Sequence, residues 1–138
     1  MTSTPFQSDP PVQNLVSLRL ANGPLSAPVL SRVVSMVLAR ADCPMNRLDD
    51  AMIVCDALSA HAPTHASDGH VAFTMDVDER KIVLRVGALA EQGATRLLAD
   101  AAVPGVGNVL ERMSDELRIE PSCTEHPREE LILTLRFG

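Results

Sequence analysis

The chain has 138 residues, which fits one domain, and its composition of 46% apolar and 22% charged residues is that of a globular protein. Its net charge of -6 repels phosphate backbones and anionic lipid, which excludes nucleic acid and membranes as expected partners. The three cysteines (Cys43, Cys55 and Cys123) have no CxxC spacing, so they indicate free thiols in a cytoplasmic protein rather than a disulfide framework or a zinc site.

The first part of the chain predicts a tail, a strand and two helices. Residues 1–13 are polar and rich in proline, which predicts a disordered tail before a single domain over 14–138. Apolar residues alternate with polar ones over 16–20, as in a half-buried strand. A helix is expected from Ser26 to the Cys43-Pro44 break, and a second from a cap at Asn46 to Pro63.

The second part predicts a hairpin, helices and two further strands. Alternation over 71–77 and again over 82–86, with a short polar connection, is typical of an antiparallel hairpin. A short helix is expected around 94–102, a break over 103–107, and a helix over 108–116. A short strand is expected from Leu117 and ends at Pro121, and a final strand covers 131–137.

This order of elements predicts an α+β fold in the form of a two-layer sandwich. The strands alternate rather than running continuously apolar, so one face of the sheet is expected to meet solvent while helices cover the other. The expected sheet is mixed and mostly antiparallel.

The second helix carries the most specific pattern in the chain. Residues 47–60 read Arg-Leu-Asp-Asp-Ala-Met-Ile-Val-Cys-Asp-Ala-Leu-Ser-Ala, and Thr-His-Ala follows at 64–66. This frame resembles the corresponding helix of anti-sigma-factor serine kinases, which belong to the Bergerat ATPase superfamily of gyrase, Hsp90, histidine kinases and MutL. The resemblance covers residues 14–137 and implies the Bergerat fold.

The same resemblance implies that this helix has lost its catalytic pair. The family's glutamate, which activates a water or hydroxyl, falls at Asp56, a vestigial base one methylene shorter. The family's magnesium-holding asparagine falls at Ala60, which offers no oxygen ligand.

The purine and phosphate positions of the family are also altered. The carboxylate that accepts the adenine amine falls at Ala88, and of the glycines that follow only Gly93 remains, one place late. Gly105 and Gly107 align with the family's last glycine-rich turn, where they either cradle a phosphate at a helix N-terminus or form only a turn. We therefore expect no cofactor.

Three further groups of residues are of types that can carry chemistry. His61, His65 and His70, with Asp68 nearby, are a conceivable metal site, but solvated loop histidines are the simpler interpretation. Cys55 lies on the apolar stripe of the second helix and is expected in the core rather than as a reactive thiol. Asp49-Asp50 is either a partner-binding patch or a favourable helix start.

The resemblance together with the altered site predicts a non-catalytic regulator that binds a sigma factor or an anti-sigma-factor antagonist in a bacterial partner-switching system. It also implies a homodimer and docking of partners over the first helix and the rim of the nucleotide site. The alternative is an active serine kinase that uses ATP and Mg²⁺ with Asp56 as base. A third hypothesis is a sensor whose emptied pocket holds another small molecule.

Overall fold

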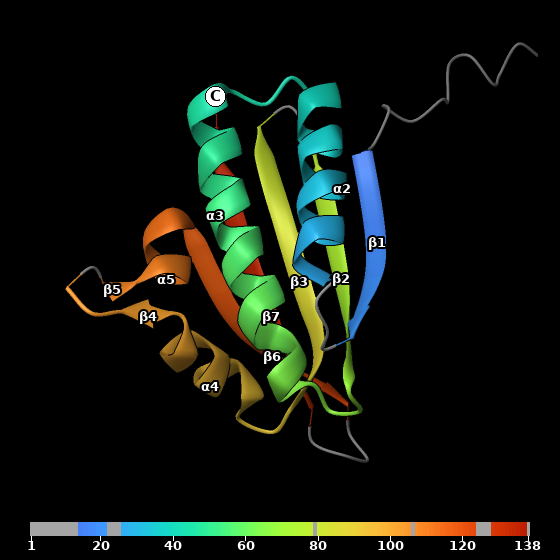
Figure 1. Ribbon diagram of the computed structural model, residues 1–138, viewed down its shortest axis with the longest axis vertical. Coiled ribbons are helices and arrows are strands. Elements are labelled where there is room, and N and C mark those ends of the chain that lie inside the picture. Colours follow the sequence, from blue (N-terminus) through green and yellow to red (C-terminus); the bar gives the residue numbers. More distant parts are fainter. Residues whose placement is uncertain (1–13, 22–25, 79, 106, 124–127, 138) are drawn as a thin grey trace, which may run out of the picture.

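The computed structural model describes residues 14–21, 26–78, 80–105, 107–123 and 128–137. The tail predicted over residues 1–13 lies outside them. The elements in chain order are β1 (Asn14–Ala21), α2 (Ser26–Arg40), α3 (Met45–His61), the 3-10 turn η1 (Ala62–His65), β2 (His70–Val77), β3 (Lys81–Ala90), α4 (Gly93–Asp100), β4 (Ala102–Val103), β5 (Gly107–Asn108), α5 (Val109–Met113), β6 (Glu116–Cys123) and β7 (Arg128–Arg136) (Figure 1).

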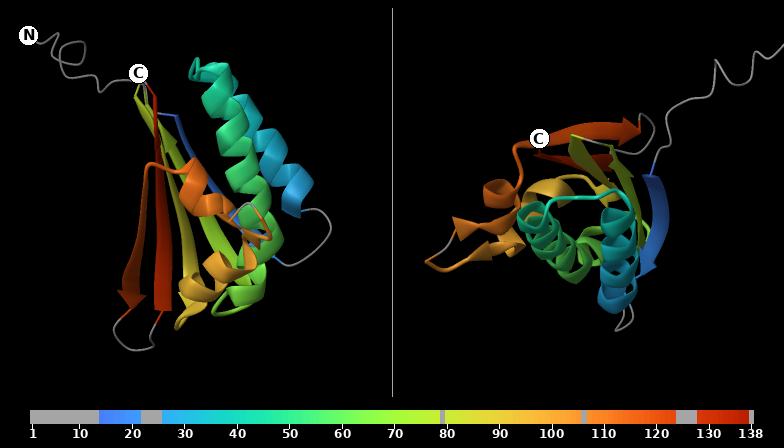
Figure 2. Two further views of the ribbon diagram at one scale, coloured as in Figure 1. Left: turned by 90° about the vertical axis from the view of Figure 1, so that its left-hand side faces the viewer. Right: turned by 90° about the horizontal axis from the view of Figure 1, so that it is seen from above.

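The fold is α+β, with the helices against one face of a five-stranded sheet (Figure 2). The strand order is β1-β2-β3-β7-β6. All four pairings between these strands are antiparallel, so the mixed sheet expected from the sequence is wrong in that respect. The cause is the hairpin of β6 and β7, which brings β7 back beside β3 in the opposite direction.

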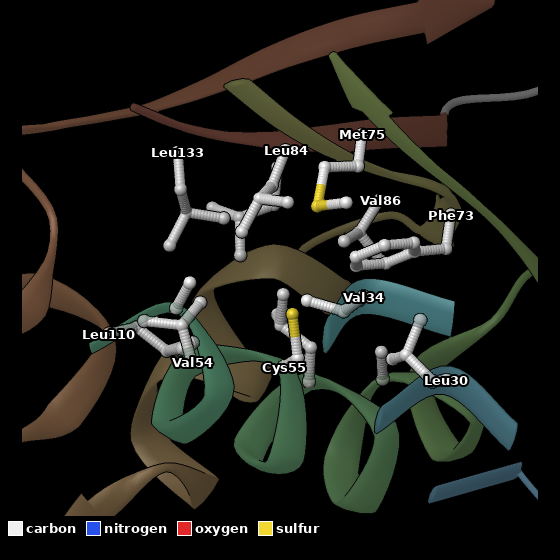
Figure 3. Close-up of a cluster of buried hydrophobic side chains, with 14 of the residues drawn as sticks. Leu30, Val34, Val54, Cys55, Phe73, Met75, Leu84, Val86, Leu110 and Leu133 are labelled. Carbon is white, nitrogen blue, oxygen red and sulfur yellow. The ribbon is translucent and has the colours of Figure 1, made fainter. Parts of the chain in front are cut away.

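Alternating residues of the central strands form the sheet side of the core (Figure 3). Phe73 and Met75 on β2 and Leu84 on β3 are fully buried, and they face helical side chains such as Leu30 and Val34 of α2. Each fully buried side chain of this kind contributes about 1.5–3 kcal/mol relative to leaving it exposed. The intervening residues Ala72, Asp76 and Arg85 are exposed, which confirms the predicted solvated face at β2 and β3. On β7, Ile132 and Thr134 lie on that same face but are buried, so solvent meets only part of it.

Some predicted boundaries need correction. Helix α3 begins at Met45 after Pro44, so Asn46 lies inside the helix and is not its cap. Helix α5 ends at Met113, earlier than expected. Strand β6 runs through Pro121 instead of ending there, because β6 is an edge strand and an edge position tolerates a residue without an N–H group.

In the part of the chain that the structure describes, no helix has the length and apolar content needed to cross a bilayer.

Candidate functional site

The predicted catalytic residue lies on the outer surface of α3. Ala51, Val54 and Leu58 point from this helix into the core. Asp56 and Ala60 are exposed on the other side, away from the sheet. Asp56 and Ala60 therefore face solvent. The other positions of the expected nucleotide site lie on different elements, with Ala88 near the end of β3 and Gly93 at the start of α4.

The backbone around Ala88 already forms a hydrogen bond and a β-bridge with another segment of the chain. The segment after η1 runs alongside the end of β3, where the Ser67 N–H donates a hydrogen bond to the Ala88 carbonyl at 3.1 Å. The neighbouring pair, Ala66 and Leu89, forms an antiparallel bridge. Ala88, at the position expected to read adenine, therefore supplies no carboxylate, and its carbonyl is bonded within the chain.

Gly93 allows η1 to pack closely against the start of α4. A Cβ added to Gly93 would lie 3.0 Å from the carbonyl oxygen of His65 and 3.2 Å from the Cβ of Leu89. Such contacts are tighter than a side chain normally makes, so glycine is needed here for close packing. His65 Nε2 also pairs with Asp100 Oδ2 at 2.5 Å, which ties this turn to the end of α4.

A carboxylate of the chain occupies the N-terminus of α4. Glu129 Oε1 on β7 accepts a hydrogen bond from the Ala94 N–H at 3.1 Å. A helix N-terminus carries partial positive charge and attracts anions, and here the anion is Glu129. A phosphate at this place would meet a fixed negative charge, so these residues do not fit a nucleotide.

Gly105 lies in the turn after β4, and Gly107 is the first residue of β5. Both are exposed, and their φ angles of +81° and +95° lie in the left-handed region that favours glycine. The helix that follows is capped by Asn108, whose Oδ1 accepts from the Leu110 N–H at 3.0 Å and the Glu111 N–H at 3.2 Å. These contacts favour the interpretation of this segment as a simple turn rather than as a phosphate-binding loop.

Asn108 also holds this turn to α4, a role that the sequence analysis missed. Its Nδ2 donates to the Leu98 carbonyl at 2.6 Å. The signal for its cap was present, because Asn108 is followed three residues later by Glu111, a typical helix-start pattern.

The histidine cluster does not form a metal site in the described part of the chain. No group of three or more His, Cys, Asp or Glu side chains gathers there in a metal-binding arrangement. His65 instead pairs with Asp100, and Asp68 Oδ1 accepts from the His70 backbone N–H at 3.2 Å.

The Cys55 thiol is part of the core, as expected. It is 1% exposed, and burial followed by the nearby charge of Asp56 raises its pKa to about 12. The thiol is therefore protonated at neutral pH and has neither the thiolate nor the access that a nucleophile needs.

Arg47, the first residue of the resembling helix frame, joins three parts of the fold. Its Nε donates to the Arg136 carbonyl at 2.7 Å and its Nη1 to Asp50 Oδ2 at 2.8 Å. Its Nη2 pairs with Asp115, whose Oδ2 also accepts from the Arg136 N–H at 2.6 Å. This cluster fixes the start of α3 to the end of β7, which is a structural role.

A cleft of about 420 Å³ lies at this same end of the sheet, remote from Ala88 and Gly93. Asp78, Arg80, Lys81 and Arg136 line it. The backbone N–H groups of Arg80 and Lys81 bind Asp78 and lower the pKa of its carboxyl, and Glu116 pairs with Arg136 at 2.7 Å. These carboxylates offset most of the positive charge, so the cleft is a poor anion site.

Comparison with known proteins identifies no family for this chain: no protein-family model matches it, and neither does any curated protein.

Proposed function

We propose that this protein is a non-catalytic, anti-sigma-factor-like regulator that acts by binding another protein, on a scaffold of the Bergerat type. The proposal rests on the hydrogen bonds that the chain makes with itself at the end of β3 and at the start of α4. Ser67 holds the Ala88 carbonyl, and Glu129 holds the N-terminus of α4 where a phosphate would otherwise bind. Ala60 also offers no oxygen ligand for magnesium, which further supports a function without Mg-ATP.

The two-layer architecture is compatible with this scaffold, because the paired helices α2 and α3 lie over one face of the sheet (Figure 1). Helix α2 is the first helix of the domain, over which partners dock in the resembled family. Its exposed apolar residues Val29 and Met36, at 47% and 67% exposure, favour protein contact at that surface. The partner under this proposal is a sigma factor or an anti-sigma-factor antagonist.

Calorimetric titration with ATP and Mg²⁺ tests the lack of a nucleotide function. We expect no binding heat at millimolar ATP, because no described group replaces the lost ligands. Saturable, magnesium-dependent binding would support the alternative of an active serine kinase that uses Asp56. A matched Asp56→Asn chain distinguishes the two, since it loses ATP turnover only if that carboxylate is a working base.

Partner binding is tested with purified bacterial sigma factors and anti-sigma-factor antagonists, titrated one at a time against the chain. A saturable complex with one of them, weakened by Met36→Glu on α2, is the expected result. Absence of a complex with any protein of these two classes from the native host would contradict the proposal. Met36→Glu changes an exposed side chain, so circular dichroism should show an unchanged fold.

A further inference from the structure

The two edges of the sheet are built in different ways. The strand order β1-β2-β3-β7-β6 leaves β1 and β6 each with one side on which no described segment of the chain pairs. Such a side presents backbone N–H and C=O groups that accept a further strand, unless the sequence of the edge strand prevents it.

Strand β6 carries several features that prevent it. Pro121 has no N–H group to offer, and the pairing of β6 with β7 shifts register between Pro121 and Cys123. The strand also contains Glu116, Arg118 and Glu120, and charged side chains on an edge strand oppose the addition of another strand. This edge of the sheet is therefore protected.

Strand β1 has none of these features. It pairs with β2 without a shift of register over all eight of its residues, from Asn14 opposite Val77 to Ala21 opposite His70. It contains no proline, and Arg19 is its only charged residue. It lies at the margin of the sheet (Figures 1 and 2). In an antiparallel pair, alternate residues direct their N–H and C=O groups away from the partner strand, so β1 offers a regular row of these groups along most of its length.

The side chains of β1 define what an added strand must carry. Val16 and Leu18 are half-buried on the helical side of the sheet, which calls for apolar side chains beside them. On the other face Leu15 is 60% exposed. Arg19 is also exposed there, lies opposite Ala72 of β2 and forms no ion pair with any described residue. A carboxylate in the added strand would give it a cross-strand partner.

We infer that the outer side of β1 binds an extended segment of another protein as a further strand of the sheet, with apolar side chains beside Val16 and Leu18 and an acidic one beside Arg19. Backbone hydrogen bonds supply the affinity of such strand addition, and alternate side chains supply its specificity. A second copy of β1 is a poorer occupant, because Asn14–Ala21 contains no acidic residue to meet Arg19. The inference does not rest on the proposed function, since it involves neither the surface of α2 nor the residues near Ala88.

The test uses the full chain, isotope-labelled for amide NMR, and the peptide acetyl-Thr-Val-Glu-Val-Thr-Val-Thr-amide. Paired antiparallel to β1, this peptide sets its glutamate beside Arg19 and valines beside Val16 and Leu18. We expect saturable binding below about 1 mM, with the largest shifts at the amides of β1.

Two N-methylated forms of the peptide test the backbone pairing without any change in the protein. One form carries the methyl groups on its valines, and the other carries them on its glutamate and on the threonines that follow it. Because alternate residues of a strand direct their N–H groups to opposite sides, only one form loses the hydrogen bonds to β1. That form should bind at least about 10-fold more weakly than the other.

The charge contact is tested by Arg19→Glu, with Arg96→Glu on α4 as the matched control at another exposed arginine. Arg19→Glu should weaken binding of the peptide by about 3–10-fold, because a like-charged pair replaces an opposite one. A peptide with lysine in place of its glutamate should recover that loss. Arg96→Glu should bind the original peptide as the native chain does.

Four results would overturn the inference: no saturable binding at about 1 mM peptide, equal binding of the two N-methylated forms, shifts centred on α2 instead of β1, or equal affinities of Arg19→Glu and Arg96→Glu. Sedimentation adds a fifth, since self-association of the native chain that the peptide reverses would assign this edge to a second copy. Circular dichroism of both variants checks that the fold is retained. The titrations with ATP and with sigma factors are read independently of these outcomes.

Discussion

The end of the sheet formed by η1, β3 and α4 differs sharply from the outer surface of α2 and α3. At the first region, backbone and side-chain groups are engaged within the chain, as in the contacts of Ala88 with Ser67 and of Ala94 with Glu129. At the second, Arg32 and Arg40 of α2 and Asp49 and Asp56 of α3 form no ion pair among the described residues, and Met36 is 67% exposed. Groups without internal partners are available for binding, and for this reason we propose the helical surface as the place where a partner binds.

The largest expected difference between the regions is in core packing. Leu97 of α4 is fully buried, so Leu97→Ala should lower the free energy of unfolding by about 2–5 kcal/mol. Met36→Ala at the outer surface should change it by no more than about 0.5 kcal/mol. Urea denaturation of both variants measures this contrast, and equal losses would contradict it.

The next largest effect on stability is expected where η1 packs closely against α4. Gly93→Ala should destabilise the protein by about 1–3 kcal/mol, because the added Cβ would press on the backbone of His65. Gly105→Ala is the control: no atom lies within 4 Å of its added Cβ, and only its positive φ opposes the change, at about 1 kcal/mol. A smaller loss for Gly93→Ala than for the control, by thermal or urea unfolding, would show that η1 is not tightly packed there.

Removing the carboxylate at the start of α4 should have a smaller effect. Glu129→Ala loses the acceptor for the Ala94 N–H and should lower the free energy of unfolding by about 1 kcal/mol. Glu129→Gln keeps an acceptor oxygen and should lose only the charge interaction, about 0.5 kcal/mol. If both variants unfold like the native chain, this carboxylate does not cap α4 in solution.

The smallest expected effect is the alkylation of Cys55, which should be slight in the native protein. At pH 8 the thiol should resist alkylation, because its pKa is raised to about 12. The raised pKa stabilises the fold fully below the ordinary value of 9.0, and this contribution is lost as the pH rises from there toward 12. Mass spectrometry after alkylation, with a Cys55→Ala chain as control, should show modification of Cys55 only after unfolding.

Local patterns predicted most of the elements. The alternation over residues 71–77 and 82–86 gave the correct hairpin, and helical spacing gave α2 and α3. The antiparallel direction of β7 and the passage of β6 through Pro121 depend on sheet order, which no local pattern specifies.

The site was harder to predict than the elements. The alignment of Ala88 with the family's carboxylate assumes a regular strand, but the pairing of β3 with β7 shifts register between Val86 and Leu89. The contact of Glu129 with Ala94 joins residues 35 positions apart, so spacing along the chain gave no sign of it. The outward direction of Asp56 followed from the apolar stripe of its own helix and was predictable.

We propose that Mg-ATP does not bind at the end of β3 and the start of α4. Titration of the isotope-labelled protein with Mg-ATP, followed by amide NMR, reports on this region directly through Ala88, Gly93 and Ala94. Our account predicts that these three amide signals do not move up to about 5 mM nucleotide, well above the roughly millimolar upper range typical of enzyme substrates. Saturable shifts at all three, dependent on magnesium, would contradict it.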